Sequence, residues 1–402
     1  MSFQSALSGL NASSRSLDVI GNNIANANTV GMKSSRAEFS DIVAASLGSG
    51  SGGGAGIGVE LATTSQLFSQ GNVNITGNDL DVAINGGGFF ELRLPDKSAA
   101  YTRDGQFKLD KLGNVVTNKG ANVMGYPTDI KGVPTSTTIQ PLQLPTAAPI
   151  GAKQTAAITA EFNLDARAPI LPVVSPIATT YGTAMTAYDS QGVPVPVNLY
   201  FSKVTPVTAG TDEWAVYQNP AGATVGSLVF DASGALTSST VGALTLTPPA
   251  PSIVPPFPVT VDVSKATQFG AGFAVSNLTQ DGYTSGELIG LKIGVDGVIT
   301  ARYSNGQTQA AGQVALADFR NVQGLSPTGG GNWIETYASG QPVQGSPGAG
   351  KFGVLTSGAL EESNIDLTAE LVNMMTAQRA YQANAQTIKT QDQIMSTLVN
   401  LR

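Results

Sequence analysis

The side chains that most often carry enzyme chemistry near neutral pH are missing from this 402-residue chain. It contains no histidine and no cysteine. The usual general base and commonest metal ligand is therefore absent, and a Ser-His-Asp triad is impossible. A thiol nucleophile and a zinc–thiolate site are equally impossible. The composition favours a protein that is not an enzyme and has no cofactor and no metal, although carboxylate-based catalysis stays open.

One glycine-rich segment matches most of a phosphate-binding motif. Residues 345–351 read Gly-Ser-Pro-Gly-Ala-Gly-Lys, which fits the first seven positions of a P-loop. The eighth position requires Ser or Thr to reach magnesium, and here it is Phe352. The sequence shows no apolar strand before the segment and no clear helix after it. We interpret it as a glycine-rich turn rather than a nucleotide site.

A pair of nearby carboxylates, Asp79 and Asp81, could indicate calcium binding or acid catalysis. Neither lies in an EF-hand frame, which needs a loop of about 12 residues that ends in Glu. We interpret both as turn-capping residues around Leu80.

The charge balance excludes two further classes of function. The chain has 28 acidic and 21 basic residues, a net charge of −7, whereas binding to nucleic acid or to an anionic membrane needs a basic face. No apolar stretch reaches the roughly 18 residues of a transmembrane helix. The N-terminus also lacks the basic region and apolar run of a signal peptide. We expect no nucleic-acid partner, no membrane insertion and no cleaved signal peptide.

Both ends of the chain are predicted to be long helices. From residue 3 to residue 24, apolar or small residues recur at alternating spacings of three and four positions. This spacing is typical of a coiled-coil seam, and we predict a helix from Ser2 to about Asn26. The residues of the seam are Phe3, Ala6, Leu10, Ser13, Leu17, Ile20 and Ile24.

The same spacing continues through the C-terminal segment 366–402, which contains no Gly or Pro. Asp366 is placed to cap this helix. Its seam consists of Leu367, Leu371, Met374, Gln378, Tyr381, Ala385, Ile388, Asp392, Met395 and Val399. Because some residues of both seams are polar, the pattern also fits two ordinary amphipathic helices that pack on a globular core. We favour helices that pack on each other and on neighbouring copies, because such long, polar helices bury little surface on one domain.

The segment between the helices is predicted to be β-rich. Short alternating runs are separated by turn signals such as Asp296-Gly297. Of the 22 prolines, 18 fall between Pro127 and Pro258. Since Pro cannot donate to a ladder, we place these prolines at edges and in loops around short strands. Residues 46–58, rich in Gly and Ser, are predicted to be flexible.

The predicted fold class is multidomain α+β, with paired terminal helices in a coiled coil and discontinuous all-β domains nested between them. The predicted parts are a terminal core (1–30 and 363–402), a linker region (31–70 and 350–362), an inner β domain (71–145 and 284–349) and an outer inserted β domain (146–283).

A run of asparagines lies near the end of the first predicted helix: Asn22, Asn23, Asn26 and Asn28. Asn is unfavourable inside a helix and favourable at its end. The run therefore indicates either a fraying helix terminus or a polar packing network that holds the helix in an assembly.

The two ends of the chain resemble the signature of bacterial flagellar axial proteins, the family of rod, hook and hook–filament junction subunits. The matching stretches are residues 17–26 with Thr29 and 31–34 at one end, and 363–374, 378–381 and 384–394 at the other. Segments 80–90 and 101–109 also resemble the family's inner β domain. The motif residues are Gly21, Asn22, Asn23, Asn26, Gly31, Asn384 and Gln386. Met32 departs from the pattern, which often has an aromatic residue there.

The length and the single inserted domain make the chain most similar to hook subunits. Rod subunits usually lack a large insertion, and junction proteins tend to be longer. The resemblance implies a homopolymer that forms a hollow, curved, flexible tube, which transmits motor torque as a universal joint. The implied partners are the distal rod protein, the hook cap, the hook–filament junction protein and the flagellar type III export apparatus. The implied location is the extracellular hook.

The terminal helices are implied to form the assembly interface. Its candidate residues are Phe3, Leu10, Leu17, Ile20, Ile24, Leu367, Leu371, Met374, Tyr381, Ile388 and Met395. Polar residues of the second helix would suit the wall of a water-filled channel: Gln382, Asn384, Gln386 and Thr387. The alternatives are a straight distal rod, a secreted β-rich adhesin with Trp214 and Tyr217 as glycan-binding candidates, and an enzyme.

Overall fold

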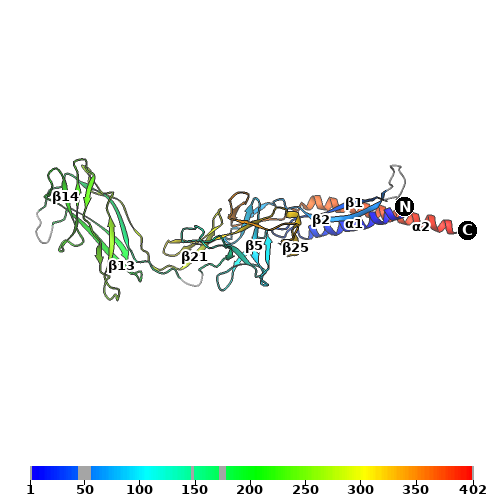
Figure 1. Ribbon diagram of the computed structural model, residues 1–402, viewed down its shortest axis with the longest axis horizontal. Coiled ribbons are helices and arrows are strands. Elements are labelled where there is room, and N and C mark those ends of the chain that lie inside the picture. Colours follow the sequence, from blue (N-terminus) through cyan, green and yellow to red (C-terminus); the bar gives the residue numbers. More distant parts are fainter. Residues whose placement is uncertain (1, 44–55, 146–148, 172–177, 401–402) are drawn as a thin grey trace. The chain divides into compact units, whose positions relative to one another are not determined.

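The computed structural model describes residues 2–43, 56–145, 149–171 and 178–400. In this part of the chain, one helix lies at each end and β-strands fill the middle, as predicted (Figure 1). The chain divides into two compact units. The first unit is Met1–Ala147, Gly290–Arg302 and Thr308–Arg402, and the second unit is Ala148–Ile289 and Tyr303–Gln307.

The terminal helices are α1 (Ser2–Ala25) and α2 (Leu367–Asn400). Asp366 caps α2 as predicted, because its Oδ1 accepts hydrogen bonds from the backbone N–H groups of Thr368 (2.9 Å) and Ala369 (3.2 Å). These bonds satisfy donors that the first turn of a helix otherwise leaves free.

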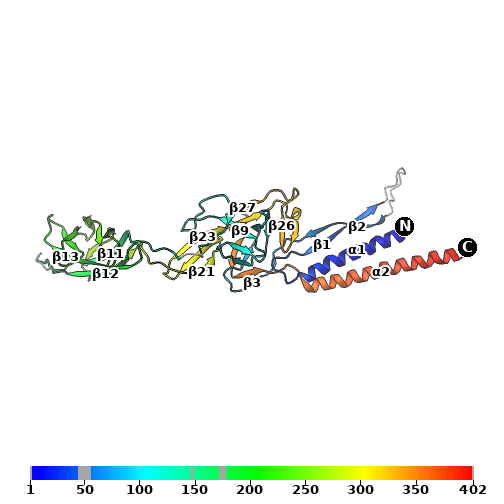
Figure 2. The same cartoon turned by 90° about the horizontal axis from the view of Figure 1, so that it is seen from below.

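The two helices lie side by side in opposite directions (Figure 2). A Cβ built on Gly9 would lie 2.9 Å from the Asn384 amide nitrogen. Closer to the other end of α1, Asn23 Nδ2 donates to Glu370 Oε1 at 3.2 Å. These two contacts define the antiparallel register. In this register, the last part of α2 extends beyond the start of α1, as Figure 2 shows.

A β-hairpin lies along α1 where the sequence predicts only a linker. Strands β1 (Ser35–Val43) and β2 (Gly56–Gln66) pair antiparallel, and the Val59 N–H donates to the Ser8 hydroxyl at 3.2 Å. Most of the segment 46–58, predicted to be flexible, lies outside the described residues.

The remaining strands of the first unit form one large sheet and two small ones. The large sheet has thirteen strands, and its main path runs β21-β22-β23-β9-β5-β6-β26-β25. The strands of this sheet are β5 (Phe89–Arg93), β6 (Ala99–Thr102), β7 (Phe107–Leu109), β8 (Val115–Thr117), β9 (Asn122–Tyr126), β10 (Gln140–Pro141), β21 (Leu288–Ile293), β22 (Val298–Tyr303), β23 (Thr308–Val314), β24 (Leu316–Asp318), β25 (Ser326–Gly329), β26 (Asn332–Ile334) and β27 (Val343–Gly345).

The two small sheets join the beginning of the β region to its end. Strand β3 (Val73–Ile75) pairs with β29 (Ala359–Glu361), and β4 (Val82–Asn85) pairs with β28 (Val354–Ser357). The segment that leads into α2 is therefore held against strands that follow α1 in sequence.

The second unit contains two five-stranded sheets around one hydrophobic core. One sheet has the order β12-β13-β14-β15-β16, and in the other β11 pairs with β18, β19 and β20. The strands are β11 (Ala157–Asp165), β12 (Tyr181–Tyr188), β13 (Pro194–Val204), β14 (Asp212–Tyr217), β15 (Thr224–Phe230), β16 (Leu236–Ser239), β17 (Leu244–Leu246), β18 (Phe257–Asp262), β19 (Thr267–Phe269) and β20 (Ala274–Gln280).

Two prolines in β13 lie at an edge, as predicted. Pro194 and Pro196 lie opposite Tyr188 and Thr186 of β12, in the part of β13 that has no partner on its other side among the described residues, because β14 pairs only with residues 200–204. The backbone N–H and C=O of Tyr188 are bonded to Thr155 instead, at 2.9 Å each. The backbone N–H and C=O of Tyr188 therefore point away from β13. A proline opposite Tyr188 removes no hydrogen bond between β12 and β13.

Candidate assembly interface

The structure divides the candidate interface residues of α1 between buried and exposed positions. Ile20 is buried, Leu10, Leu17 and Ile24 are half-buried, and Phe3 is 48% exposed. Phe3 is therefore the exposed member of this set, whereas Ala6, the next residue of the predicted seam, is buried.

The α2 residues are divided in the same way. Met374 and Ile388 are half-buried, while Leu367, Leu371 and Met395 are 43%, 50% and 61% exposed and Tyr381 is 38% exposed. The α2 residues with the lowest exposure are Glu370, Met374, Ala377, Asn384, Ala385, Ile388 and Gln391. Met374, Ala385 and Ile388 belong to the predicted seam, whereas Glu370, Ala377, Asn384 and Gln391 each lie one position before a predicted seam residue. This small rotation of α2 brings Glu370 to Asn23, from which it accepts a hydrogen bond, and Asn384 against Gly9.

Exposed apolar side chains lie near both ends of α2: Leu367, Leu371, Val372 and Met375 near its start, and Ile394 and Met395 where it extends beyond the start of α1. Exposed apolar surface of this kind can mark an interaction site. Contact of these residues with a neighbouring copy stays a prediction.

Asn384 does not lie on an open polar face, because it packs against Gly9 of α1. Gln382, Gln386 and Thr387 are exposed as expected. The Thr387 hydroxyl donates to the Ala383 carbonyl at 3.0 Å, so it is satisfied within the helix.

A groove of about 510 Å³ lies beside the helix pair, between α1, β1 and α2. Small side chains line much of it, including Ala12 and Ser16 on α1 and Ala377 and Ala380 on α2. Small residues allow another element to approach a helix closely.

The asparagine run contains a residue that ends the helix and a buried residue that forms a polar network within the chain, while a role in an assembly stays a prediction. Asn23 is buried; its Nδ2 donates to the Ser35 carbonyl at 2.8 Å and to Glu370, and its Oδ1 accepts from the Ser35 N–H at 2.9 Å. It thus joins α1, β1 and α2 within one chain. Asn26 instead ends the helix, since its N–H (3.1 Å) and Nδ2 (2.9 Å) both donate to the Asn22 carbonyl.

The two motif glycines differ in their surroundings. Gly31 has a φ of +69°, and a Cβ there would lie 2.6 Å from the Arg103 carbonyl carbon and from the Asp104 nitrogen. Only glycine fits this backbone conformation and this approach. A Cβ on Gly21 would meet no atom within 4 Å.

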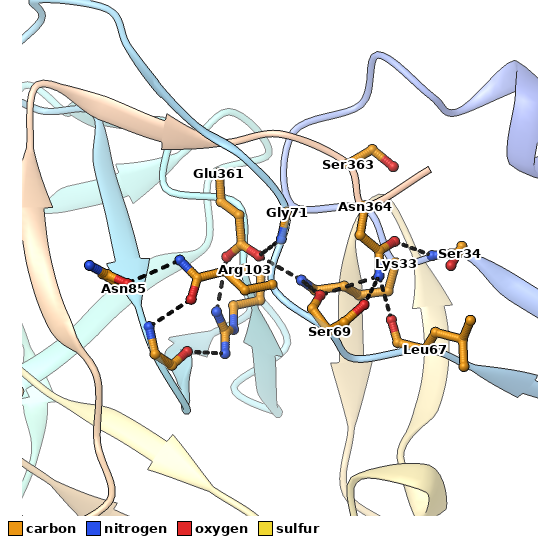
Figure 3. A network of polar contacts seen from close by, with 12 residues as sticks. Lys33, Ser34, Leu67, Ser69, Gly71, Asn85, Arg103, Glu361, Ser363 and Asn364 are labelled. Atoms are coloured by element: carbon orange, nitrogen blue, oxygen red, sulfur yellow. Dashed lines mark hydrogen bonds and ion pairs between the residues drawn. The ribbon is translucent and has the colours of Figure 1, made fainter. Parts of the chain in front are cut away.

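A buried ionic cluster lies just beyond the helix pair, and we call Lys33, Arg103 and Glu361 the clasp (Figure 3). Lys33 Nζ lies 2.6 Å from Glu361 Oε1, and Arg103 Nη1 lies 2.9 Å from Glu361 Oε2. The three side chains are 1%, 6% and 0% exposed. Burial lowers the pKa of Lys33, and the attraction of Glu361 opposes this shift.

Backbone groups complete the clasp. Lys33 Nζ donates to the Ser69 carbonyl (2.7 Å), and Arg103 Nη2 donates to the Gly86 carbonyl (2.8 Å). Glu361 Oε1 also accepts from the Gly71 N–H at 3.0 Å. Buried charges are tolerated when they are paired and hydrogen-bonded in this way.

Asn364 extends this network toward α2, as Figure 3 shows. Its Oδ1 accepts from the Ser34 N–H, and its Nδ2 donates to the Leu67 carbonyl, both at 2.7 Å. Lys33, Arg103 and Asn364 lie in stretches that carry the family resemblance, but the sequence did not reveal that they meet. The signal that the sequence offered was a charged residue, Lys33 or Arg103, in two of these stretches of a chain with only 12% charged residues, whereas Glu361 lies outside the stretches.

The other candidate chemistry is absent from the described residues. In the P-loop-like segment, the Phe352 ring packs against Gly345, and backbone bonds from Ala349 to Ser346 and from Phe352 to Ala349 form turns. Asp81 accepts from Thr76 Oγ1 (2.7 Å) and Asn78 Nδ2 (3.1 Å), which confirms a turn role.

The structure also tests the two glycan-binding candidates and the expectations about metal ions and membranes. Trp214 and Tyr217 are buried in the core of the second unit, so they cannot stack on a glycan. Across the described residues, no three His, Cys, Asp or Glu side chains gather to hold a metal ion. No helix among these residues is long and apolar enough to cross a membrane.

Four protein-family models match successive parts of the chain. They are described as Flagella basal body rod protein (residues 3–33), Flagellar hook protein FlgE/F/G D1 domain (83–159), Flagellar basal body protein FlaE D2 domain (163–283) and Flagellar basal body rod FlgEFG protein C-terminal (356–401). Two of them cover the terminal helices, and two cover β regions.

Whole-length relatives agree with these matches. The chain is 41% identical to the flagellar hook protein FlgE of Escherichia coli (strain K12) over 422 aligned positions, covering 100% of both proteins. It is 33% identical to the FlgE of Rhizobium meliloti (strain 1021), covering 99% of this chain and 98% of that protein.

A solved structure shares the fold. The crystal structure of the Helicobacter pylori flagellar hook protein FlgE2 aligns with a TM-score of 0.56 and 15% identity, covering 72% of this chain and 100% of that one. The full-length similarity and the matched models lead to one assignment. The chain belongs to the flagellar hook protein FlgE family and is a structural, non-enzymatic subunit of the flagellar hook.

Proposed function

We propose that copies of this chain join head to tail into the curved, hollow tube of the hook and act there as a universal joint. Contacts between unlike surfaces of identical subunits produce open helical polymers. The observation that carries this proposal is the group of exposed apolar side chains near the start of α2, including Leu371 and Val372, in a chain of the hook family.

The terminal helices form a coiled-coil core along the inner wall of the tube. The antiparallel register set at Gly9 and Asn23 supports this pairing. The exposed polar side chains of Gln382, Gln386 and Thr387 suit a water-filled channel. A helix of a neighbouring copy occupies the groove beside α1, which small residues line.

The domains are nested, with a terminal core (1–30 and 363–402), a linker region (31–70 and 350–362), an inner β domain (71–145 and 284–349) and an outer β domain (146–283). The pairing of β3 with β29 and of β4 with β28 supports this nesting, because each pair joins an outgoing to a returning segment. The outer domain sets curvature and stiffness.

The partners are further copies of the chain, the distal rod protein, the hook cap and the hook–filament junction protein. The flagellar type III apparatus exports the chain without a cleaved signal peptide, and the assembled hook is extracellular. The terminal helices complete their folding when subunits stack.

Leu371→Asp tests the assembly role. Because Leu371 is half exposed in the single chain, the charge should leave the monomer folded but block polymerisation, where burying it would cost several kcal/mol. Sedimentation and electron microscopy would show monomers in place of tubes, with an unchanged circular dichroism spectrum.

Leu371→Met is the matched control, since it keeps an apolar side chain of similar volume, and it should assemble normally. Ile388→Asp should also block assembly, but with a disturbed helix pair, because Ile388 is half-buried in the single chain. Tubes of normal yield from Leu371→Asp would contradict the proposed interface.

A further inference from the structure

The clasp joins three segments that are far apart in the chain. Lys33 lies between α1 and β1, Arg103 follows β6 of the large sheet, and Glu361 ends β29 just before α2. One charged residue thus comes from the segment that follows α1, one from the strand that precedes α2, and one from the turn after a strand of the large sheet.

We propose that the clasp is a mechanical joint. It attaches both terminal helices to the sheet cooperatively, and it transmits force between the helices and the sheet. The coupling of the three segments is a property of the single chain. Only the force-carrying part rests on the proposed function of the polymer.

The coupling follows from how the carboxylate divides its bonds. Each oxygen of Glu361 faces a cation from a different segment, Lys33 on Oε1 and Arg103 on Oε2. Removing one partner of a buried ion pair leaves an uncompensated charge, which is strongly unfavourable. If one of the three segments detaches, a buried charge on another segment is left unpaired, so the other segments should detach as well.

Backbone contacts among the same segments make the joint short and stiff. The Gly31 N–H donates to the Glu361 carbonyl at 2.8 Å, and the Gly31 backbone lies too close to Arg103 for any side chain. The Arg103 guanidinium carbon lies 5.4 Å from the centre of the Phe89 ring, a cation–π contact that links the clasp to the aromatic core of the sheet.

A second set of contacts joins the two helix bases directly. Asn364, before α2, binds the Ser34 N–H, before β1. Asn23, near the end of α1, binds both Ser35 and Glu370. Motion of one helix base is thus transmitted to the other without passing through the solvent-exposed parts of the helices.

Hydrogen exchange of full-length monomer tests the coupling in Glu361→Gln, which leaves two buried cations facing a neutral amide. We expect exchange to rise together, by about 100-fold, at three places: residues 31–35, 101–105 and 363–370. Lys33→Met should loosen the same three places, because coupling between sites is reciprocal.

Faster exchange only in the segment that carries the substitution would overturn the coupling, since a merely local structural role predicts that result. Arg103→Lys keeps the charge but not the bond to Gly86, so hydrogen exchange should rise less at the same three places. This milder variant tests the coupling if Glu361→Gln does not fold. Glu38→Gln is the control; it breaks an ion pair with Arg36 whose side chains are 64% and 40% exposed, and it should change none of the three.

Polymerised tubes test the force-carrying part. We expect tubes of Arg103→Lys to bend more under thermal fluctuation in electron micrographs than wild-type tubes. Normal stiffness together with three-site loosening would refute the mechanical role and leave the coupling intact. Failure of the wild-type chain to form tubes would instead count against the proposed function.

Discussion

Asp281 shows how one carboxylate holds the entry and exit of the second unit together. Its Oδ1 accepts from the backbone N–H groups of Ala156 (2.8 Å) and Ala157 (3.0 Å), and its Oδ2 lies 2.9 Å from Lys153 Nζ. Burial raises the pKa of Asp281, but the hydrogen bonds from Ala157 and Ala156 and the Lys153 ammonium outweigh it, so the pKa falls from 3.8 to about 2.

The lowered pKa predicts an acid-sensitive contribution to stability. A carboxyl group with a depressed pKa in the folded state stabilises fully above its unfolded value, 3.8, and this contribution is lost as the pH falls toward 2. Asp281→Asn should lower the free energy of unfolding by about 1 kcal/mol at neutral pH, a value discounted for partial exposure. It should also flatten the pH dependence between about 4 and 2.

Trp214 fluorescence in a Trp333→Phe background would report on the second unit during urea unfolding, because Trp214 is buried in its core. Lys153→Met is the control. It keeps both backbone bonds to Asp281 and should cost less than Asp281→Asn. If the free energy of unfolding of Asp281→Asn had the same pH dependence as that of the wild type, this carboxylate would not hold the entering and leaving segments of the second unit together.

At the scale of elements, the helix pair depends on a close contact between Gly9 and Asn384. This contact and the Asn23–Glu370 bond define the register, whereas the apolar residues alone would allow several rotations of α2. Polar seam residues commonly specify register at some cost in stability.

Gly9→Leu should disturb the pair. Leucine favours the helix more than glycine does, so any loss reflects overpacking against Asn384, which typically costs about 1–3 kcal/mol. We expect faster hydrogen exchange in α1 and α2 of the monomer. Asn384→Ala added to Gly9→Leu should restore part of the protection because it makes room for the leucine.

Asn11→Leu, at an exposed position of the same helix, is the control for added hydrophobicity. Equal exchange in Gly9→Leu and Asn11→Leu would show that Gly9 is not a contact that sets the register.

At the scale of the whole molecule, the second unit leaves and rejoins the chain at adjacent points. Lys153 bridges Tyr283 and Ile150 bridges Gly286, so its entering and leaving segments run antiparallel side by side. A unit whose ends lie close together can be removed with little strain on the rest of a chain.

Replacement of residues 148–289 by a short Gly-Ser linker is therefore expected to leave the first unit folded and able to form tubes. These tubes should be straighter or softer than wild-type tubes, because the outer contacts are missing. Electron microscopy would measure their curvature, and a scrambled linker of equal length would control for the linker itself. A complete lack of tubes would show that the second unit is needed for assembly.

Periodicity and composition predicted a large part of this architecture. The helices begin and end within about two residues of their predicted bounds, because heptad spacing and the Asp366 cap are local features. The Asp81 turn and the glycine-rich turn at 345–351 were predicted for the same reason. The β1–β2 hairpin was missed, since its strands are mostly polar and pack along a helix rather than in a core.

The candidate interface was predictable as a set of residues but not as a surface. Heptad spacing alone could not decide which side of α2 faces α1, and it placed Asn384 on the open side. The clasp was not predictable from spacing, because Lys33, Arg103 and Glu361 are separated by most of the chain. No local pattern pairs charges over such distances.

The sequence by itself thus determined the absence of the usual catalytic groups, the two terminal helices, the β-rich middle and the family resemblance. Each of these depends on composition or on neighbours within a few turns of the chain. Only the tertiary structure decided the rotation of α2, the burial of Trp214 and the meeting of Lys33, Arg103 and Glu361. These features depend on which distant segments pack together. Whether a buried charge stabilises or destabilises the fold depends on the partner that this packing brings to it.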